Sequence, residues 1–198
     1  MALEHQIAIV TGAGTGIGAA AAKMIAAEKA TVVLVGRRIE PLEATKADIE
    51  AAAGTAITAT ADLTNGTAVD QLANDVIQKF GRVDILVNNA GFSSKIRSVR
   101  YVQPDEWDSV FKVNMEAVYR LTQACLPVMI EQGQGTIITT SSMSALKPGV
   151  LGGSPYSAAK AASRAFSHGL NSELRDQGIR ATAIIPAEVD TALSLIHI

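Results

Sequence analysis

Short runs of apolar residues alternate along the chain with longer segments in which apolar residues recur at helical spacing. The short runs are rich in β-branched residues and predict strands; they lie at residues 7–10, 31–35, 56–60, 84–88, 136–139 and 180–185. The longer segments predict helices at residues 16–29, 40–53, 67–80, 104–132 and 155–177. Pro127 falls inside the longest of these helices and is expected to kink or interrupt it.

This alternation predicts an α/β fold with one doubly wound parallel sheet. Apolar strands joined by helical connections must run parallel, because each connection has to cross back over a face of the sheet. Right-handed crossovers then place helices on both faces. Ligands of such sheets bind beyond the carboxyl ends of the strands, so chemically active residues are expected there.

The composition fits a single domain of this kind and disfavours several partners. The chain has 198 residues, of which 48% are hydrophobic and 4% aromatic, as expected for buried strands with Ala-rich helices. A net charge of −2 without a basic block makes nucleic acid and anionic membranes poor partners. No stretch reaches membrane-spanning length and no secretory signal pattern is present. We therefore expect a cytoplasmic protein that binds neither membrane nor nucleic acid.

Cysteine and histidine usage predicts neither a disulfide nor a metal site. Cys125 sits in an apolar helical stretch and is expected to be a buried, inert thiol. A lone cysteine cannot form an intramolecular disulfide, which fits a reducing cytoplasm. The three histidines, at positions 5, 168 and 197, lack the spacing of metal ligands.

A glycine-rich turn follows the first predicted strand and opens an Ala-rich helix. Its glycines are Gly12, Gly14, Gly16 and Gly18. Glycine permits positive φ and a close approach of backbone to phosphate, and the helix N-terminus presents free N–H groups to anions. Such a turn can be merely structural, but the strand-turn-helix context favours dinucleotide binding.

Tyr156 and Lys160 stand four residues apart in a predicted helix. Positions four apart lie on one helix face, so the phenol and the ammonium can meet. A nearby cation favours phenolate and is expected to lower the pKa of Tyr156 towards neutrality. That suits proton exchange with an alcohol. We predict a nicotinamide-dependent oxidoreductase.

Several motifs, in order, resemble the short-chain dehydrogenase/reductase family over about residues 5–191. The glycines are spaced Gly-x-x-x-Gly-x-Gly, and Asn-Asn-Ala-Gly follows at 88–91. A serine pair after the fifth strand, Tyr-x-x-x-Lys and Pro-Ala-Glu-Val-Asp-Thr at 186–191 complete the series. The resemblance implies a Rossmann fold and an NAD(P)-dependent oxidoreductase similar to 3-oxoacyl-carrier-protein reductases.

The resemblance implies a catalytic set of four residues, namely Asn114, Ser142, Tyr156 and Lys160. Ser142 would donate to the substrate carbonyl oxygen, with Ser141 and Ser144 as alternatives. Tyr156 would exchange the proton, and Lys160 would lower its pKa and hold the nicotinamide ribose. Asn114 would distort its helix and hold a water beside Lys160.

The implied cofactor site draws on the ends of several strands. It consists of Gly12, Gly14, Thr15, Gly16, Ile17, Gly18, Arg37, Arg38, Asp62, Leu63, Asn89, Ala90, Gly91, Tyr156, Lys160, Pro186, Val189 and Thr191. Asp62 would contact adenine, although an Asp there can instead cap a helix. The backbone at Val189 and the Thr191 hydroxyl would hold the nicotinamide carboxamide, and Ala187 replaces the usual glycine beside them. The Asn-Asn-Ala-Gly element would support the sheet and line the adenosine side.

The end of the second strand favours NADP over NAD. Gly36 occupies the place of the acidic residue that selects NAD in this family, and Arg37 follows it. A guanidinium can bind the 2′-phosphate of NADP through two hydrogen bonds. Thr15 is not the basic residue that many NADP-selective members carry in the glycine turn, and both arginines can be solvated loop charges. We therefore keep NAD as the alternative.

Family members usually continue beyond Thr191 with a substrate-covering segment, a seventh strand and a last helix. We therefore expect an incomplete domain over 1–192. Residues 193–198 resemble translated sequencing-adapter sequence and are expected to be an artefactual tail; a genuinely short protein is the alternative. The leading prediction is a carbonyl reductase or alcohol dehydrogenase acting on a small molecule. The alternatives are an NAD(P)-binding sensor or inactive fragment without turnover, and a nucleotide-sugar epimerase. The parent protein is expected to be a homotetramer or homodimer through helices 104–132 and 155–177. Cations in loop 92–103 indicate an anionic or polar substrate, or a solvated loop.

Overall fold

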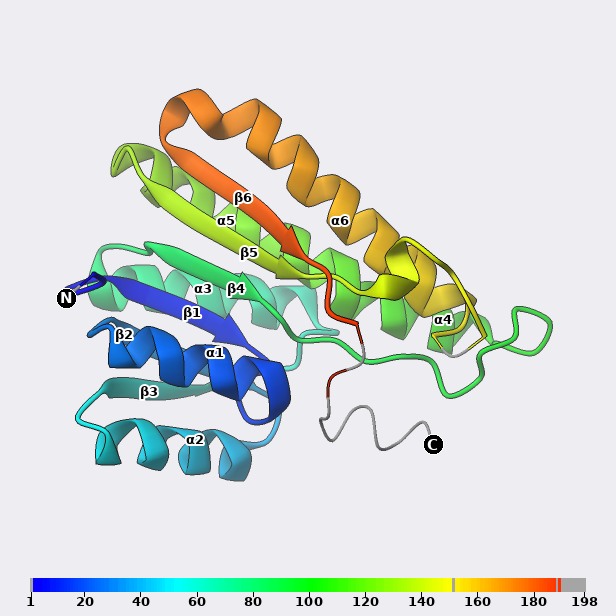
Figure 1. Ribbon diagram of the computed structural model, residues 1–198, viewed down its shortest axis with the longest axis horizontal. Coiled ribbons are helices and arrows are strands. Elements are labelled where there is room, and N and C mark those ends of the chain that lie inside the picture. The colour runs from blue at the N-terminus through cyan, green and yellow to red at the C-terminus, as the bar shows by residue number, and fades with distance from the viewer. Residues whose placement is uncertain (1, 151, 188, 190–198) are drawn as a thin grey trace.

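The computed structural model describes residues 2–150, 152–187 and 189, and its centre is a six-stranded parallel sheet (Figure 1). The strand order is β3-β2-β1-β4-β5-β6, which confirms the predicted doubly wound sheet. The strands are β1 (Ile7–Thr11), β2 (Thr31–Gly36), β3 (Thr55–Thr60), β4 (Ile85–Asn88), β5 (Gly135–Thr140) and β6 (Ile179–Ile184). The strand order reverses between β1 and β4, so a crevice opens at their carboxyl ends.

Helices cover the sheet in two layers. They are α1 (Gly16–Ala27), α2 (Ile39–Ala51), α3 (Gly66–Phe80), α4 (Pro104–Phe111), α5 (Ala117–Glu131) and α6 (Ser154–Leu174). Short helical segments are η1 (Lys112–Glu116), η2 (Met143–Ala145) and η3 (Arg175–Gln177). In Figure 1, α1 and α2 lie on one face of the sheet and α3, α5 and α6 on the other.

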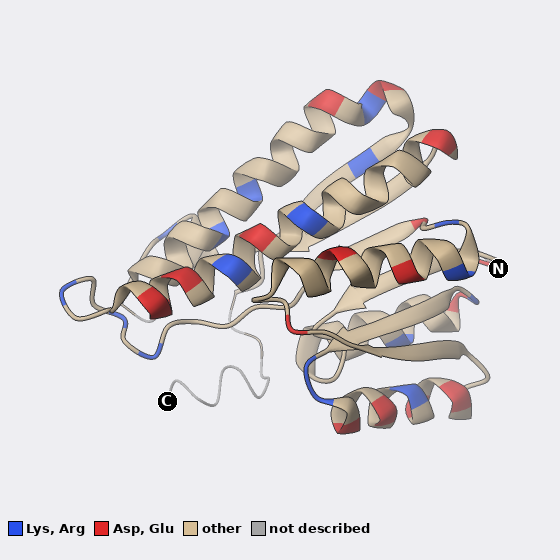
Figure 2. Ribbon diagram, turned by 180° about the vertical axis from the view of Figure 1, so that it is seen from behind, with Lys and Arg blue, Asp and Glu red and all other residues tan. Residues whose placement is uncertain are grey.

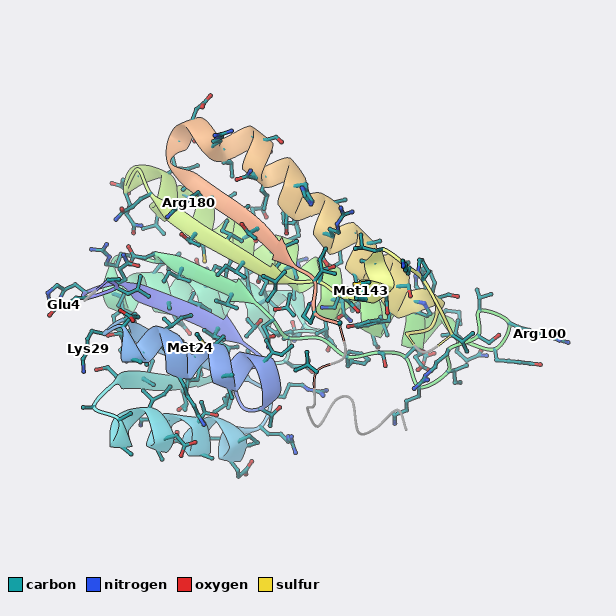
Figure 3. All side chains as sticks on the ribbon, viewed as in Figure 1. Glu4, Met24, Lys29, Arg100, Met143 and Arg180 are labelled. Atoms are coloured by element: carbon teal, nitrogen blue, oxygen red, sulfur yellow. The ribbon has the colours of Figure 1, made fainter. Side chains whose placement is uncertain are left out.

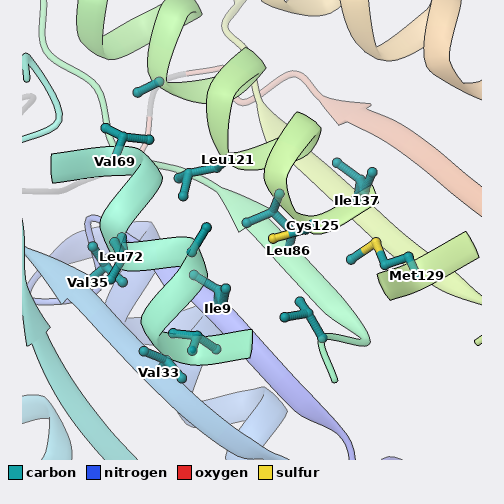
Figure 4. Packing of buried hydrophobic residues seen from close by; sticks show 14 of the residues in the cluster. Ile9, Val33, Val35, Val69, Leu72, Leu86, Leu121, Cys125, Met129 and Ile137 are labelled. Atoms are coloured by element: carbon teal, nitrogen blue, oxygen red, sulfur yellow. The ribbon is translucent and has the colours of Figure 1, made fainter. Parts of the chain in front are cut away.

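Alternate residues of the central strands pack into two separate hydrophobic clusters, one on each face of the sheet. Ile9 and Val33 pack with α3 and α5, in a cluster that also contains Cys125 (Figure 4). Val10 and Leu34, one position further along, pack with α1 and α2. Because successive side chains of a strand point to opposite faces, a strand covered on both faces reads as a continuous apolar run.

Cys125 is fully buried, as predicted. Burial raises the pKa of its thiol to about 12, so it stays protonated and unreactive at neutral pH. In the part of the chain that the structure describes, none of the helices is both long and apolar enough to cross a membrane.

The predicted helix 104–132 is divided, but not at Pro127. α5 continues through Pro127, so of the predicted kink or interruption the interruption does not occur. Pro127 has no N–H, so the Gln123 carbonyl lacks its helical hydrogen-bond partner. Both residues are exposed, so water can donate to that carbonyl oxygen instead. The division lies instead at η1, a π-helical turn that contains Asn114.

Asp84 joins the amino-terminal ends of β1 and β4. Its buried carboxylate accepts a hydrogen bond from the Ile7 amide at 2.8 Å and two from the Arg82 guanidinium at 2.6 and 2.9 Å. We expect Asp84→Ala to lower the free energy of unfolding by about 2–4 kcal/mol, because the Ile7 N–H is left buried without a partner. Urea denaturation measures this.

The control is Asp48→Ala, which removes the exposed ion pair with Lys23. That loss is expected to cost less than about 1 kcal/mol. Equal losses for the two variants would contradict a structural role for Asp84.

Candidate active site

Two adjoining cavities lie at the carboxyl ends of the central strands. They measure about 240 and about 190 Å³, and Gly12, Thr15, Ala90 and Gly91 border both. Of the predicted cofactor residues, the larger cavity is lined by Gly12, Thr15, Gly16, Ile17, Asn89, Ala90, Gly91, Tyr156, Lys160, Pro186 and Val189. The smaller is lined by Gly12, Gly14, Thr15, Arg37, Arg38, Leu63, Ala90 and Gly91. Gly18 and Asp62 line neither, and Thr191 lies outside the described residues.

The glycine turn forms a cradle that larger residues would fill. Gly12 has φ +66°, and a Cβ there would lie 3.0 Å from both Ala90 Cα and Asn89 Nδ2. A Cβ on Gly18 would overlap the Gly12 carbonyl, so this glycine packs α1 against the turn. Thr15 is the N-cap of α1 and makes no side-chain cap hydrogen bond. The Thr15 side chain therefore does not compete for the first amides of α1, and Gly16 and Ile17 line the larger cavity, as an anion site requires.

Asn89 ties the central strands together beneath the cavities. Its Nδ2 donates to the Thr11 carbonyl at 3.0 Å, and its Oδ1 accepts from the Thr140 hydroxyl at 3.2 Å. The Thr11 hydroxyl in turn accepts the Asn89 and Ala90 amides at 2.9 Å each. These bonds link β1, β4 and β5, which confirms that this motif supports the sheet.

Arg37 and Arg38 stand at the outer end of the smaller cavity, just after β2. Both are exposed, and the cavity continues past Gly36 to Leu63. Asp62 is not a helix cap, because Asn65 caps α3. Hydrogen bonds from the Thr64 amide and hydroxyl, and then the charge of Arg37, hold the pKa of Asp62 below its usual range.

Ser142, Tyr156 and Lys160 meet in the larger cavity. Ser142 follows β5, while α6 carries the other two residues. The Ser142 hydroxyl is near enough to the Tyr156 phenol to favour its ionised form. Lys160 Nζ donates to the Thr140 carbonyl at 2.7 Å and lies 5.7 Å from the centroid of the Tyr156 ring. Of the two alternative serines, Ser141 also lines the larger cavity, but it is buried and its hydroxyl donates to the Lys160 carbonyl at 2.9 Å. Ser144 does not line this cavity.

The predicted lowering of the Tyr156 pKa is wrong for this structure. Burial raises the pKa of Tyr156, and the nearby Ser142 hydroxyl opposes this only in part. Burial also lowers the pKa of Lys160 to about 8. The ammonium is turned towards the Thr140 carbonyl, so its charge does not offset the desolvation of the phenol. Tyr156 is a protonated phenol at neutral pH, which is the form that donates a proton.

Asn114 lies in the π-helical turn, as its expected helix distortion requires. It is fully buried, and its Nδ2 donates to the Phe92 and Val110 carbonyls at 2.9 Å each. Its Oδ1 is buried without a hydrogen-bond partner. A Cβ on Gly91 would lie 2.5 Å from this oxygen and 3.1 Å from Lys160 Nζ. The two polar atoms therefore border the same small space beside Gly91, which is polar enough to hold a water.

The segment after β6 closes one side of the larger cavity. Pro186, Ala187 and Val189 line it, and the Met143 amide donates to the Pro186 carbonyl at 3.1 Å. Ala187 is not among the described residues with positive φ, so replacing the family's glycine imposes no backbone strain here. The described residues contain no group of three or more His, Cys, Asp or Glu side chains able to hold a metal.

Two threonines outside the predicted set of residues contribute to the site. Thr11 holds the Asn89 turn through its hydroxyl, and Thr140 binds Lys160 through its backbone carbonyl. A threonine at the end of a β-rich run is ordinary in a strand, and a backbone carbonyl can belong to any residue. Only the threonine side chain directly before the glycine turn could have been suspected.

The strand order and the glycine cradle place the protein among the Rossmann-fold proteins. The family model for short chain dehydrogenases matches residues 6–195. An oxidoreductase of Staphylococcus aureus, described as uncharacterized, is 40% identical over 194 residues, covering 97% of this chain and 81% of the relative. The chain belongs to the short-chain dehydrogenase/reductase family.

Solved structures of the family superpose closely on this chain. A metagenomic short-chain oxidoreductase in complex with NADP is 38% identical, with a TM-score of 0.90 over 96% of this chain and 85% of the other. A putative NAD(P)-dependent gluconate 5-dehydrogenase from Beutenbergia cavernae, with bound NADP, is 31% identical. Its TM-score is 0.92 over 98% of this chain and 76% of the other.

Proposed function

We propose that the protein reduces a small carbonyl compound, or oxidises the corresponding secondary alcohol, with NADP(H). The observation that carries this is the meeting of Ser142, Tyr156 and Lys160 in a cavity that also borders the glycine cradle. A protonated phenol and a second hydroxyl in the same cavity supply two donors for a developing alkoxide. Membership of an oxidoreductase family supports the same reaction class.

Each residue of the proposed set has a separate task. The bound nicotinamide would supply or accept the hydride. Ser142 and Tyr156 would hold the substrate oxygen, and Tyr156 would give it a proton on reduction. Lys160 would hold the cofactor ribose and pass a proton to the phenolate left behind. A water between Asn114 Oδ1 and Lys160 Nζ would then return a proton from solvent.

The purified protein with NADPH and the α-diketone diacetyl tests this function. NADPH oxidation should require the diketone and yield the hydroxyketone. The competing proposal is an NADP(H)-binding sensor, which the accessible cradle would also serve. NADPH binding without turnover of diacetyl or of other small carbonyl compounds would favour the sensor.

NADP(H) is the proposed cofactor because Arg37 and Arg38 border the smaller cavity and an acidic side chain is missing at Gly36. Two structural relatives are described with bound NADP. We expect Arg37→Ala to weaken NADPH binding about tenfold to a hundredfold, by removing charge-assisted bonds to the 2′-phosphate. NADH binding should change less than about twofold. Isothermal titration with both nucleotides measures this.

Arg100→Ala is the matched control for that measurement. Arg100 lies at the far end of loop 92–103, pointing away from the sheet (Figure 3). Its loss should leave both affinities unchanged. Similar dissociation constants for NADH and NADPH in the unmodified protein, unaltered by Arg37→Ala, would contradict NADP selectivity.

A cytoplasmic location and a homodimer or homotetramer are proposed with this function. α5 and α6 are the long helices that would meet in the assembly. Tyr119 of α5 is 43% exposed and packs edge-on against Phe166 of α6. An aromatic pair at this surface is the kind of group that buries well against a second copy.

A further inference from the structure

The loop between β4 and α4 starts inside the cofactor cleft. Gly91 and Phe92 line the smaller cavity, and the Phe92 carbonyl accepts a hydrogen bond from Asn114 Nδ2 at 2.9 Å. The loop then leaves the sheet and carries three cations, Lys95, Arg97 and Arg100, with no acidic residue before α4 (Figure 2).

Glu106, in the first turn of α4, accepts hydrogen bonds from the beginning of this loop. One carboxylate oxygen, Oε1, accepts from the Ser94 hydroxyl at 2.7 Å, the Lys95 amide at 2.6 Å and the Ile96 amide at 3.2 Å. Ser94 is 1% exposed, although it lies in a loop. The hydrogen bond from Ser94, followed by those from the two amides, holds the pKa of Glu106 below its usual range. The carboxylate is therefore charged at neutral pH, when these bonds are strongest.

The next residue of the loop contacts the start of α6. The Arg97 carbonyl accepts from the Ser154 amide at 3.2 Å, which satisfies one free N–H of the helix. Gly153 has φ +73°, and a Cβ there would lie 2.8 Å from Arg97 Cα. Two backbone segments thus touch at a point that only glycine permits. Tyr156 stands in the same first turn of α6.

We propose that Glu106 is a positioning residue for the reaction, an inference that rests on the proposed reductase function. Its carboxylate fixes residues 94–96, and the adjoining Arg97 holds the first turn of α6 in place. The Tyr156 hydroxyl is thereby set relative to the substrate carbonyl. Proton transfer depends steeply on this geometry, and a misplacement of about 1 Å can cost about a hundredfold in rate.

Three variants test the inference. Glu106→Ala removes the acceptor, Glu106→Gln keeps a neutral one, and Asp105→Ala changes the exposed acidic neighbour in the same turn of α4. Diacetyl is the probe substrate. Glu106→Ala is expected to raise KM about tenfold and lower kcat about tenfold, while the NADPH dissociation constant changes less than about twofold. Glu106→Gln should recover part of the loss, and Asp105→Ala should match the unmodified protein.

Hydrogen exchange supplies a second readout that does not depend on turnover. The amides of Lys95, Ile96 and Ser154 should exchange faster in Glu106→Ala, because each is held directly or through the loop. Should that variant not fold, Glu106→Gln takes its place in both measurements.

The outcomes separate the two proposals. Kinetics of Glu106→Ala equal to those of Asp105→Ala would overturn the positioning role. Faster exchange with unchanged KM and kcat would also overturn it, since Glu106 would then only stabilise the loop. Absence of turnover in the unmodified protein would instead overturn the reductase function, and this inference with it.

Discussion

Tyr156→Phe is expected to lower kcat for diacetyl reduction about a thousandfold while NADPH binds as before. The phenol is the proposed proton donor, and loss of a general acid typically costs about a hundredfold to ten-thousandfold. The ring itself remains, so the packing of this mostly buried side chain beside Gly152 is preserved. Steady-state kinetics and NADPH titration by fluorescence measure the two quantities on the same preparation.

Tyr119→Phe is the matched control for this prediction. It removes the same hydroxyl from a tyrosine on α5 that is 43% exposed, and it should leave kcat unchanged. If Tyr156→Phe retained more than about a tenth of the rate, another group would have to supply the proton. Ser142 would then be the first residue to examine.

Lys160→Met is expected to stabilise the cofactor-free protein near neutral pH while it abolishes reduction. Burial lowers the pKa of Lys160 from 10.5 to about 8, so holding its proton at pH 7 costs the folded state about 3 kcal/mol. Methionine fills a similar volume without a charge. The Thr140 carbonyl loses its partner, which offsets about 1 kcal/mol. The net gain of about 2 kcal/mol should raise Tm by about 4–8 °C.

The stability gained by Lys160→Met is expected to depend on pH. The unfolded chain keeps the lysine proton up to its ordinary pKa of 10.5, whereas the folded chain releases it near pH 8. Between these values the unfolded state binds more protons, so the stability of the unmodified protein rises with pH. The advantage of Lys160→Met should therefore be full below about pH 8 and shrink towards pH 10.5. Differential scanning calorimetry across this range measures it.

Lys147→Met provides the comparison, since it removes an exposed lysine from the loop after β5. The difference in Tm between Lys147→Met and the unmodified protein should not change across this pH window. A Tm for Lys160→Met at pH 7 below that of the unmodified protein would show that the buried ammonium stabilises the fold.

The fold could be predicted from the sequence because the local hydrophobic patterns and the rules of sheet topology indicated the same architecture. Each strand boundary moved by only a residue or so, since β-branched runs between glycine and asparagine turns have few alternatives. The glycine cradle and the joint placement of Ser142, Tyr156 and Lys160 also followed from the sequence. Their roles in catalysis and cofactor binding stay predictions.

What the sequence could not provide depended on burial and on contacts distant in sequence. The four-residue spacing predicts that Tyr156 and Lys160 are near each other, but not that both are desolvated or that the ammonium faces Thr140. Glu106 appeared to be an ordinary acidic residue of a first helical turn, as such turns favour. Its three donors lie ten to twelve residues away, in a loop without regular structure.

The π-helical turn at η1 has a consequence for how sequences of this family can be aligned and altered. Such a turn behaves as one extra residue within an α-helix. Removing it would rotate everything that follows by about 100°. Leu121, Cys125 and Met129 of α5, which now face the sheet, would turn away from it. An alignment gap between residues 112 and 116 therefore implies a different core as well as a lost asparagine. The number of residues in this turn is therefore constrained as strictly as their identity.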